Sequence, residues 1–74
     1  MNIGDQVQVT IKTVDDMGYL VNIDAYNVEG FISLSDAHRK RASVKNRLIV
    51  GNQYMASIVR MNNGFCDLRL VNRG

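Results

Sequence analysis

Residues 29–48 read EGFISLSDAHRKRASVKNRL, and the fold prediction rests on this segment. An apolar run, Val28 to Leu34, ends within it, and a hydrophilic segment follows that carries five basic side chains: Arg39, Lys40, Arg41, Lys45 and Arg47. Against the single carboxylate of Asp36, they give residues 35–47 a formal charge of +4, whereas the whole chain carries +2 and the other residues therefore sum to −2. Charge of one sign concentrated in a segment is typical of a surface that meets an acidic partner.

Period-two alternation of apolar and polar residues predicts five short strands on either side of this segment, at residues 6–12, 19–23, 28–34, 53–61 and 65–71. In the fourth run Tyr54, Ala56 and Ile58 share a face, and in the fifth Cys66, Leu68 and Leu70 do so. Turn residues separate the first three runs, and Asn62-Asn63-Gly64 predicts a tight hairpin between the last two.

The long connection between the third and fourth strands favours the order of an OB-fold. We therefore predict an all-β protein, a five-stranded OB-fold Greek-key barrel with a long basic loop or short helix between strands three and four. Residues 1–74 form a single domain in this prediction. A small SH3-like barrel or another β meander is the alternative, because periodicity alone does not separate them.

The composition argues against an enzyme. His38 is the only histidine and lies beside three cations, which disfavour its protonated form, while Cys66 lies in the middle of a predicted strand. One histidine and one cysteine are too few for a four-ligand zinc site, and no glycine-rich phosphate loop is present, so we expect no metal and no cofactor. The sequence has no apolar run of the ~20 residues that cross a bilayer and no signal peptide, so we expect a cytoplasmic protein that avoids membranes.

Four motifs resemble the S1 RNA-binding domain family: Gly4-Asp5-Gln6-Val7, Met17-Gly18-Tyr19-Leu20-Val21, Glu29-Gly30-Phe31-Ile32-Ser33-Leu34-Ser35 and Gly51-Asn52. The resemblance implies an S1-type OB barrel. RNA-binding members of the family carry two aromatic residues and a histidine where this sequence has Met17, Leu20 and Ser33. These departures remove stacking surfaces, so we expect RNA binding to be weak or nonspecific at most.

Three residues remain candidates for RNA contact: Tyr19, Phe31 and Lys45. The two rings could stack on bases, with Tyr26 as a further partial substitute, and Lys45 could meet a phosphate. Tyr19 and Phe31 also lie on alternating strands, so a place in the core is the alternative for both.

Further motifs resemble the N-terminal domain of the alpha subunit of eukaryotic translation initiation factor two. They are Asp16-Met17-Gly18-Tyr19, Tyr26-Asn27-Val28-Glu29-Gly30, Leu34-Ser35-Asp36, Arg39-Lys40-Arg41, Asn46-Arg47-Leu48-Ile49 and Gly64-Phe65-Cys66-Asp67-Leu68. The resemblance implies that the basic segment of that factor presents a regulatory serine to stress-activated kinases. The glycine-aromatic-x-aspartate strand belongs to the kinase-docking surface.

His38 stands immediately before Arg39-Lys40-Arg41, where the factor has its acceptor serine, and it offers no hydroxyl to a serine/threonine kinase. The sequence thus most resembles free-standing viral mimics that are pseudosubstrates of the double-stranded-RNA-activated protein kinase. The kinase-binding residues that this resemblance implies are His38, Arg39, Lys40, Arg41, Arg47, Gly64, Phe65 and Asp67.

The hypothesis is therefore a non-catalytic monomer that binds a kinase of the initiation factor in the host cytoplasm and keeps translation on. The alternatives are an S1-type RNA-binding module and the N-terminal domain of a genuine alpha subunit. Ser35 and Ser43 remain alternative phosphate acceptors, because the alignment of His38 depends on where a one-residue gap is placed.

Overall fold

The computed structural model describes residues 1–33 and 48–71, which form five strands. The strands are β1 (Gln6–Val14), β2 (Gly18–Ile23), β3 (Val28–Ser33), β4 (Gln53–Asn62) and β5 (Phe65–Leu70). The predicted strands are confirmed, with ends displaced by one or two residues. The predicted basic loop or short helix between strands three and four lies outside the described residues.

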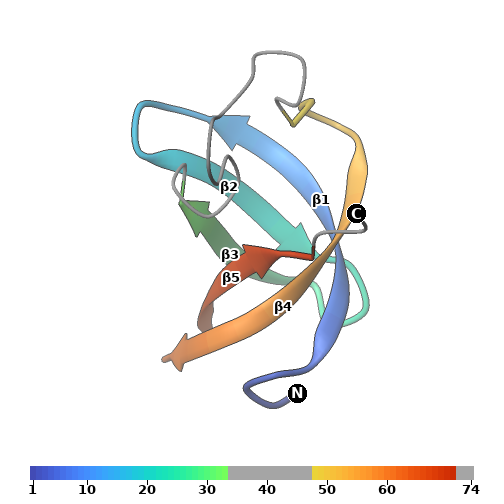
Figure 1. Ribbon diagram of the computed structural model, residues 1–74, viewed down its shortest axis with the longest axis vertical. Helices are drawn as coiled ribbons and strands as arrows, with labels where there is room; N and C mark the ends of the chain where they lie inside the picture. Colours follow the sequence, from blue (N-terminus) through green and yellow to red (C-terminus); the bar gives the residue numbers. More distant parts are fainter. Residues whose placement is uncertain (34–47, 72–74) are drawn as a thin grey trace.

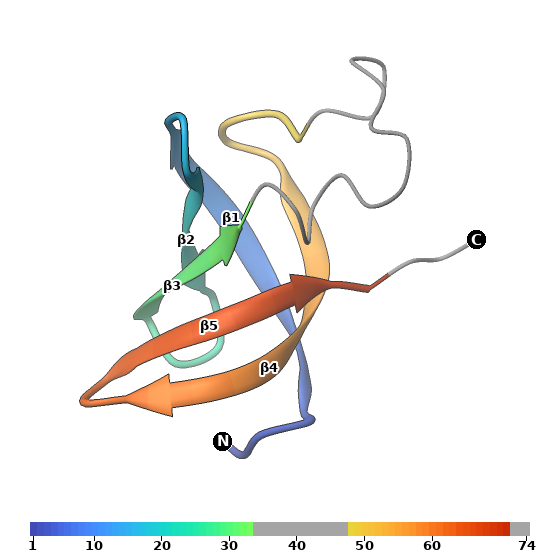
Figure 2. The same ribbon diagram turned by 60° about the vertical axis from the view of Figure 1, so that its left-hand side comes forward.

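The strands close into a barrel in the order β1-β2-β3-β5-β4 (Figure 1). β1 pairs with β2 and β4, and all neighbouring pairs are antiparallel except β3 with β5. Figure 2 shows β3 and β5 running in the same direction. Because the barrel is closed and its single parallel pair joins strands three and five, the OB-type Greek-key prediction is confirmed, and the β-meander alternative is excluded.

Alternating side chains of all five strands fill the barrel. The buried hydrophobic residues are Val9, Ile11, Tyr19, Val21, Ile23, Ile32, Leu48, Ala56, Ile58, Cys66 and Leu68. The predicted inward faces of the fourth and fifth strands are therefore confirmed, with Tyr54 and Leu70 packed against the core at its margin. Leu48 returns the chain to the core, whereas Ile49 and Val50 are exposed.

Turn residues adopt the backbone conformations that their positions require. Asn63 and Gly64 have φ angles of 41° and 80°, which is the left-handed pair expected in the tight hairpin between β4 and β5. The Asp15 carboxylate accepts hydrogen bonds from the backbone N–H groups of Met17 (2.8 Å) and Gly18 (3.1 Å), which fixes the turn between β1 and β2.

Asp24 joins three strands through its carboxylate. It accepts side-chain hydrogen bonds from Thr10 (2.7 Å), Gln53 (3.2 Å), Gln8 (3.3 Å) and Asn22 (3.4 Å). Partial burial raises the pKa of Asp24, but the four hydrogen bonds together outweigh this effect, so its pKa lies below the ordinary value. The acidic residue therefore has a structural role at the end of the barrel where β1, β2 and β4 meet.

Candidate functional site

The outer surface of β2, β3 and β5 carries the candidate binding residues. Opposed residues of paired strands share a face, and the pairing aligns Leu20 with Phe31 and Phe31 with Asp67. The next pair on the same face, toward the end of β3, is Gly18 with Ser33. The face thus presents one aromatic ring between an aliphatic side chain and a carboxylate.

Phe31 lies on this outer surface and is partly exposed, and its ring packs over Gly18. A Cβ atom at residue 18 would come within 2.7 Å of Phe31 Cζ. The glycine therefore provides the space that the ring occupies. The ring lies beside Leu20 and Ser33, two of the three positions at which the resemblance implies stacking residues in RNA-binding S1 domains.

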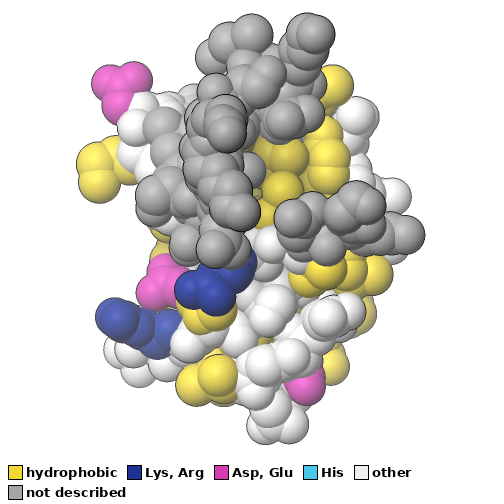
Figure 3. All heavy atoms as spheres, in the orientation of Figure 1, with side chains coloured by type: hydrophobic (Ala, Val, Ile, Leu, Met, Phe, Trp, Pro, Cys, Tyr) yellow, Lys and Arg dark blue, Asp and Glu magenta, His cyan; other side chains and the backbone are white. Residues whose placement is uncertain are grey.

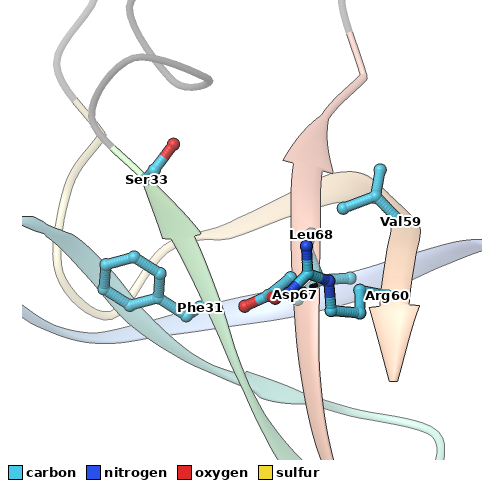
Figure 4. A pocket seen from close by; sticks show the side chains of 6 residues that line it. All are labelled: Phe31, Ser33, Val59, Arg60, Asp67 and Leu68. Carbon is cyan, nitrogen blue, oxygen red and sulfur yellow. Dashed lines mark ion pairs between the residues drawn. The ribbon is translucent and has the colours of Figure 1, made fainter. Parts of the chain in front are cut away.

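A pocket of about 410 Å³ opens beside this ring. Its lining comes from three strands and consists of Phe31, Ser33, Val59, Arg60, Asp67 and Leu68 (Figure 4). In the close view the Arg60 side chain extends from β4 toward Asp67 on β5, and the Asp67 carboxylate points toward β3. Arg60 Nε lies 3.8 Å from Asp67 Oδ2.

Arg60 was not predicted as a site residue, because a bulge sets its direction. Strict alternation after Ala56 and Ile58 would turn Arg60 inward. The register shifts between Ile58 and Arg60, so Val59 is the extra residue and Arg60 lies opposite Asp67 on the outer surface. The sequence does contain a signal of this bulge. Strict alternation would bury Arg60 without a partner in an apolar core, and burying that charge would be costly.

Tyr19 is placed differently from the RNA-contact prediction. Its side chain is fully buried, and its hydroxyl accepts a 3.4 Å hydrogen bond from the backbone N–H of Leu48. The Tyr54 hydroxyl likewise accepts a 3.0 Å hydrogen bond from the backbone N–H of Ile49. The core alternative therefore holds for Tyr19, because a ring with no exposed surface cannot stack on a base.

The remaining candidate residues fall into two groups. Gly64 lies in the exposed β4–β5 hairpin, and Phe65, with 36% of its surface exposed, begins β5 two residues before Asp67. The other predicted residues lie outside the described part of the chain: His38, Arg39, Lys40, Arg41, Lys45 and Arg47.

The described part of the barrel is acidic. Residues 1–33 and 48–71 contain three Lys or Arg and six Asp or Glu, a formal charge of −3, whereas the other residues sum to +5. Lys12 pairs with Glu29 at 2.9 Å, and Arg60 pairs with Asp67. On the face shown in Figure 3, the described basic side chains lie close to an acidic one and form no continuous basic surface. The positive charge of this protein therefore resides mainly in residues 34–47.

Cys66 and the carboxylates do not form a reactive or metal-binding centre in the described ranges. Burial, together with the charge of Asp67, raises the pKa of the Cys66 thiol, which keeps it in the unreactive protonated form. Among residues 1–33 and 48–71, no group of three or more His, Cys, Asp or Glu side chains is arranged to hold a metal ion. In the same ranges, no helix has the length and apolar character to cross a bilayer.

The S1 RNA binding domain family matches residues 1–71 of this chain. The chain belongs to the S1 RNA-binding domain family. An S1 domain is typically a non-catalytic binding module, and the closed five-stranded barrel is its OB fold. The family assignment that the sequence motifs predicted is therefore confirmed.

The S1 domain is also similar to the alpha subunit of initiation factor two. It is 34% identical over 70 residues to eukaryotic translation initiation factor 2 subunit 1 of Plasmodium berghei, an alignment that covers 89% of this chain and 22% of that protein. The chain thus spans about a fifth of the length of this curated relative. The predicted resemblance to the N-terminal domain of the subunit is confirmed.

Solved structures show the same fold. The a/eIF2alpha–aDim2p–rRNA complex from Pyrococcus horikoshii contains a chain with a TM-score of 0.84 and 24% identity, aligned over 95% of this S1 domain and 44% of that chain. A protein from the Wisconsin strain of vaccinia virus has a TM-score of 0.62 and 16% identity, over 100% of this S1 domain and 96% of that chain. This viral protein is one structural neighbour among many.

Proposed function

We propose that this S1 domain binds single-stranded RNA with modest affinity through the outer surface of β2, β3 and β5. One observation carries the proposal: the partly exposed Phe31 ring occupies the centre of this surface, beside the pocket that Arg60 and Asp67 line. The membership in an RNA-binding family supports it. Met17, Leu20 and Ser33 offer no stacking surface at the positions where RNA-binding members of the family have one. The ring of Phe31 provides a stacking surface at a different position.

The affinity is modest for two physical reasons. A single stacked base contributes only about 1–3 kcal/mol, and S1 domains with several rings add such contacts together. The described barrel is acidic and repels phosphates, so the basic residues 39–47 supply the attraction to the backbone. Binding is therefore expected to weaken as salt is added.

Replacing Phe31 by leucine tests the stacking role. We expect binding of a short fluorescent oligouridine, followed by anisotropy at low salt, to weaken about 5- to 150-fold, since the ring contact is worth about 1–3 kcal/mol. Tyr26→Leu is the matched control: Tyr26 was a partial substitute for stacking in the sequence prediction, but it lies 48% exposed in the turn between β2 and β3 and does not line the pocket. Equal binding by wild type and Phe31→Leu, with both variants folded by circular dichroism, would reject the proposal.

A second candidate function is that of a kinase pseudosubstrate. It is favoured by the likeness to the initiation-factor subunit and by the surface position of Phe65 and Asp67 on β5. In this function the barrel surface docks on a kinase, and Arg39-Lys40-Arg41 steer it toward an acidic lobe. His38 occupies the acceptor position without a hydroxyl that can take a phosphoryl group.

Kinase assays with His38 variants test this second function. We expect the purified domain to lower phosphorylation of the initiation-factor alpha subunit by the double-stranded-RNA-activated kinase, and His38→Ser to become phosphorylated itself. His38→Ala is the control, because it alters the side chain without adding a hydroxyl. Unchanged phosphorylation of the factor in excess domain would eliminate the pseudosubstrate function.

A further inference from the structure

The pocket beside Phe31 combines three recognition elements. The aromatic ring offers a stacking surface, the Asp67 carboxylate offers two acceptor oxygens and the Arg60 guanidinium offers a fork of donors. They come from different strands, β3, β5 and β4, that closure of the barrel brings together. Such a set matches a planar ligand that has both donors and acceptors on its edges.

Asp67 and Arg60 are available to a ligand. Their side chains are 39% and 69% exposed, and the 3.8 Å contact between them is longer than the ~2.7–2.9 Å of a strong charge-assisted hydrogen bond. An exposed and loosely paired arginine and aspartate contribute little to stability. A ligand can therefore enter the pair without breaking a strong interaction.

The hydrogen-bond donors and acceptors of the four RNA bases decide which base fits this pocket best. A carboxylate that accepts two parallel hydrogen bonds requires two adjacent N–H donors, and only guanine has them, at N1 and N2. Guanine also presents O6 and N7 as acceptors, the pair that arginine recognises most often. Cytosine and adenine each offer a single amino group, so they would use one carboxylate oxygen, and uracil has only one imino donor.

We propose that this pocket binds a guanine base, a specificity that rests on the proposed RNA-binding function. The base stacks on Phe31, donates from N1 and N2 to the Asp67 carboxylate and accepts at O6 from Arg60. Single-stranded RNA suits this arrangement, because unpaired bases expose their Watson–Crick edges and both ring faces. The volume of about 410 Å³ lies within the range of pockets that hold small molecules.

Single-base replacements in the RNA test the proposal. Short oligouridines carrying one central guanine, inosine, adenine or cytosine are compared by anisotropy with wild-type protein. We expect guanine to bind about tenfold more tightly than adenine or cytosine, the size of one good bidentate contact. Inosine lacks the N2 amino group but keeps N1–H and O6, so most of the preference is expected to disappear with it. Tightest binding of cytosine, or equal binding of inosine and guanine, would overturn the assignment.

Protein variants provide the complementary test. We expect Asp67→Asn to abolish the preference for guanine, because the amide has a single acceptor oxygen. Glu29→Gln is the matched control: Glu29 is an exposed acid on the neighbouring strand β3, but it pairs with Lys12 and does not line the pocket. A guanine preference that persists in Asp67→Asn would contradict the proposal.

The two levels of proposal fail in different ways. Oligouridine binding with no preference for guanine rejects the guanine pocket and leaves RNA binding intact. Absence of binding to any RNA rejects RNA binding, and guanosine monophosphate is then titrated into ¹⁵N-labelled protein. Amide shifts at Phe31, Ser33 and Asp67 that guanosine monophosphate causes at lower concentration than inosine or adenosine monophosphate support the pocket. No such shifts, or equal shifts with all three nucleotides, overturn it.

Discussion

Replacing Tyr19 by alanine is expected to unfold the domain or to lower its free energy of unfolding by about 3–5 kcal/mol, as for large aromatic residues in other cores. Tyr19 is the largest fully buried side chain among the described residues. A domain of 74 residues has a small core, and total stabilities near the low end of about 5–15 kcal/mol are expected for such chains. The loss therefore consumes much of the stability. Urea unfolding followed by circular dichroism measures it.

Tyr19→Phe separates the hydroxyl from the ring. It removes the acceptor of the hydrogen bond from Leu48 N–H and leaves the ring volume unchanged. We expect a smaller loss, about 0.5–1.5 kcal/mol. If Tyr19→Ala unfolds at the same urea concentration as the wild type but loses RNA binding, Tyr19 lies on the surface, and its place in the core is refuted.

The strand pattern of this protein was predictable, because half of each strand is buried and half is not. Ala56, Ile58, Cys66 and Leu68 all face inward as their spacing predicts. The hairpin between β4 and β5 was equally clear, since Asn63 and Gly64 both tolerate positive φ angles. These features depend on local sequence, so one chain suffices to predict them.

The places of Tyr19 and Phe31 were harder to predict. Tyr19, Leu20 and Val21 form a continuous apolar run, in which alternation alone does not reveal which residues face inward. The choice is made by pairing: Leu20 lies opposite Phe31, and Gly18 opposite Ser33, which turns Tyr19 into the barrel. Register between strands is a long-range property, and it decided which ring reaches the surface.

The pocket was the hardest feature to predict, because the structural features that form it are the ones that the sequence shows least clearly. Arg60 reaches Asp67 because of a one-residue bulge in β4, and Asp67 reaches Phe31 because β5 pairs in parallel with a strand more than thirty residues earlier in the chain. Asp67 and Phe31 were both predicted as site residues, but Arg60 was not. A shared fold can thus indicate where binding occurs, while the chemistry of the site comes from side chains specific to this chain.

Gly18→Ala is expected to disturb both the fold and this site, with a loss of about 3 kcal/mol in the free energy of unfolding, at the upper end of typical overpacking costs. The added Cβ would collide with the backbone oxygen of Ile32 and would lie 2.9 Å from Ser33 Cα and 2.7 Å from Phe31 Cζ. The first two contacts involve backbone of the paired strand β3, which cannot move without weakening the β2–β3 ladder. Chemical unfolding curves of the wild type and the variant measure the loss.

Gly64→Ala is the control for this steric effect. Residue 64 has a positive φ angle of 80°, but a Cβ there would meet no atom within 4 Å. Its cost is therefore limited to backbone strain, about 1–2 kcal/mol. Because the Phe31 ring must shift if it is to remain beside a side chain at residue 18, Gly18→Ala is also expected to weaken RNA binding even where the protein is still folded. Equal stabilities for the two variants would show that β2 and β3 do not approach as closely at residue 18 as this packing requires.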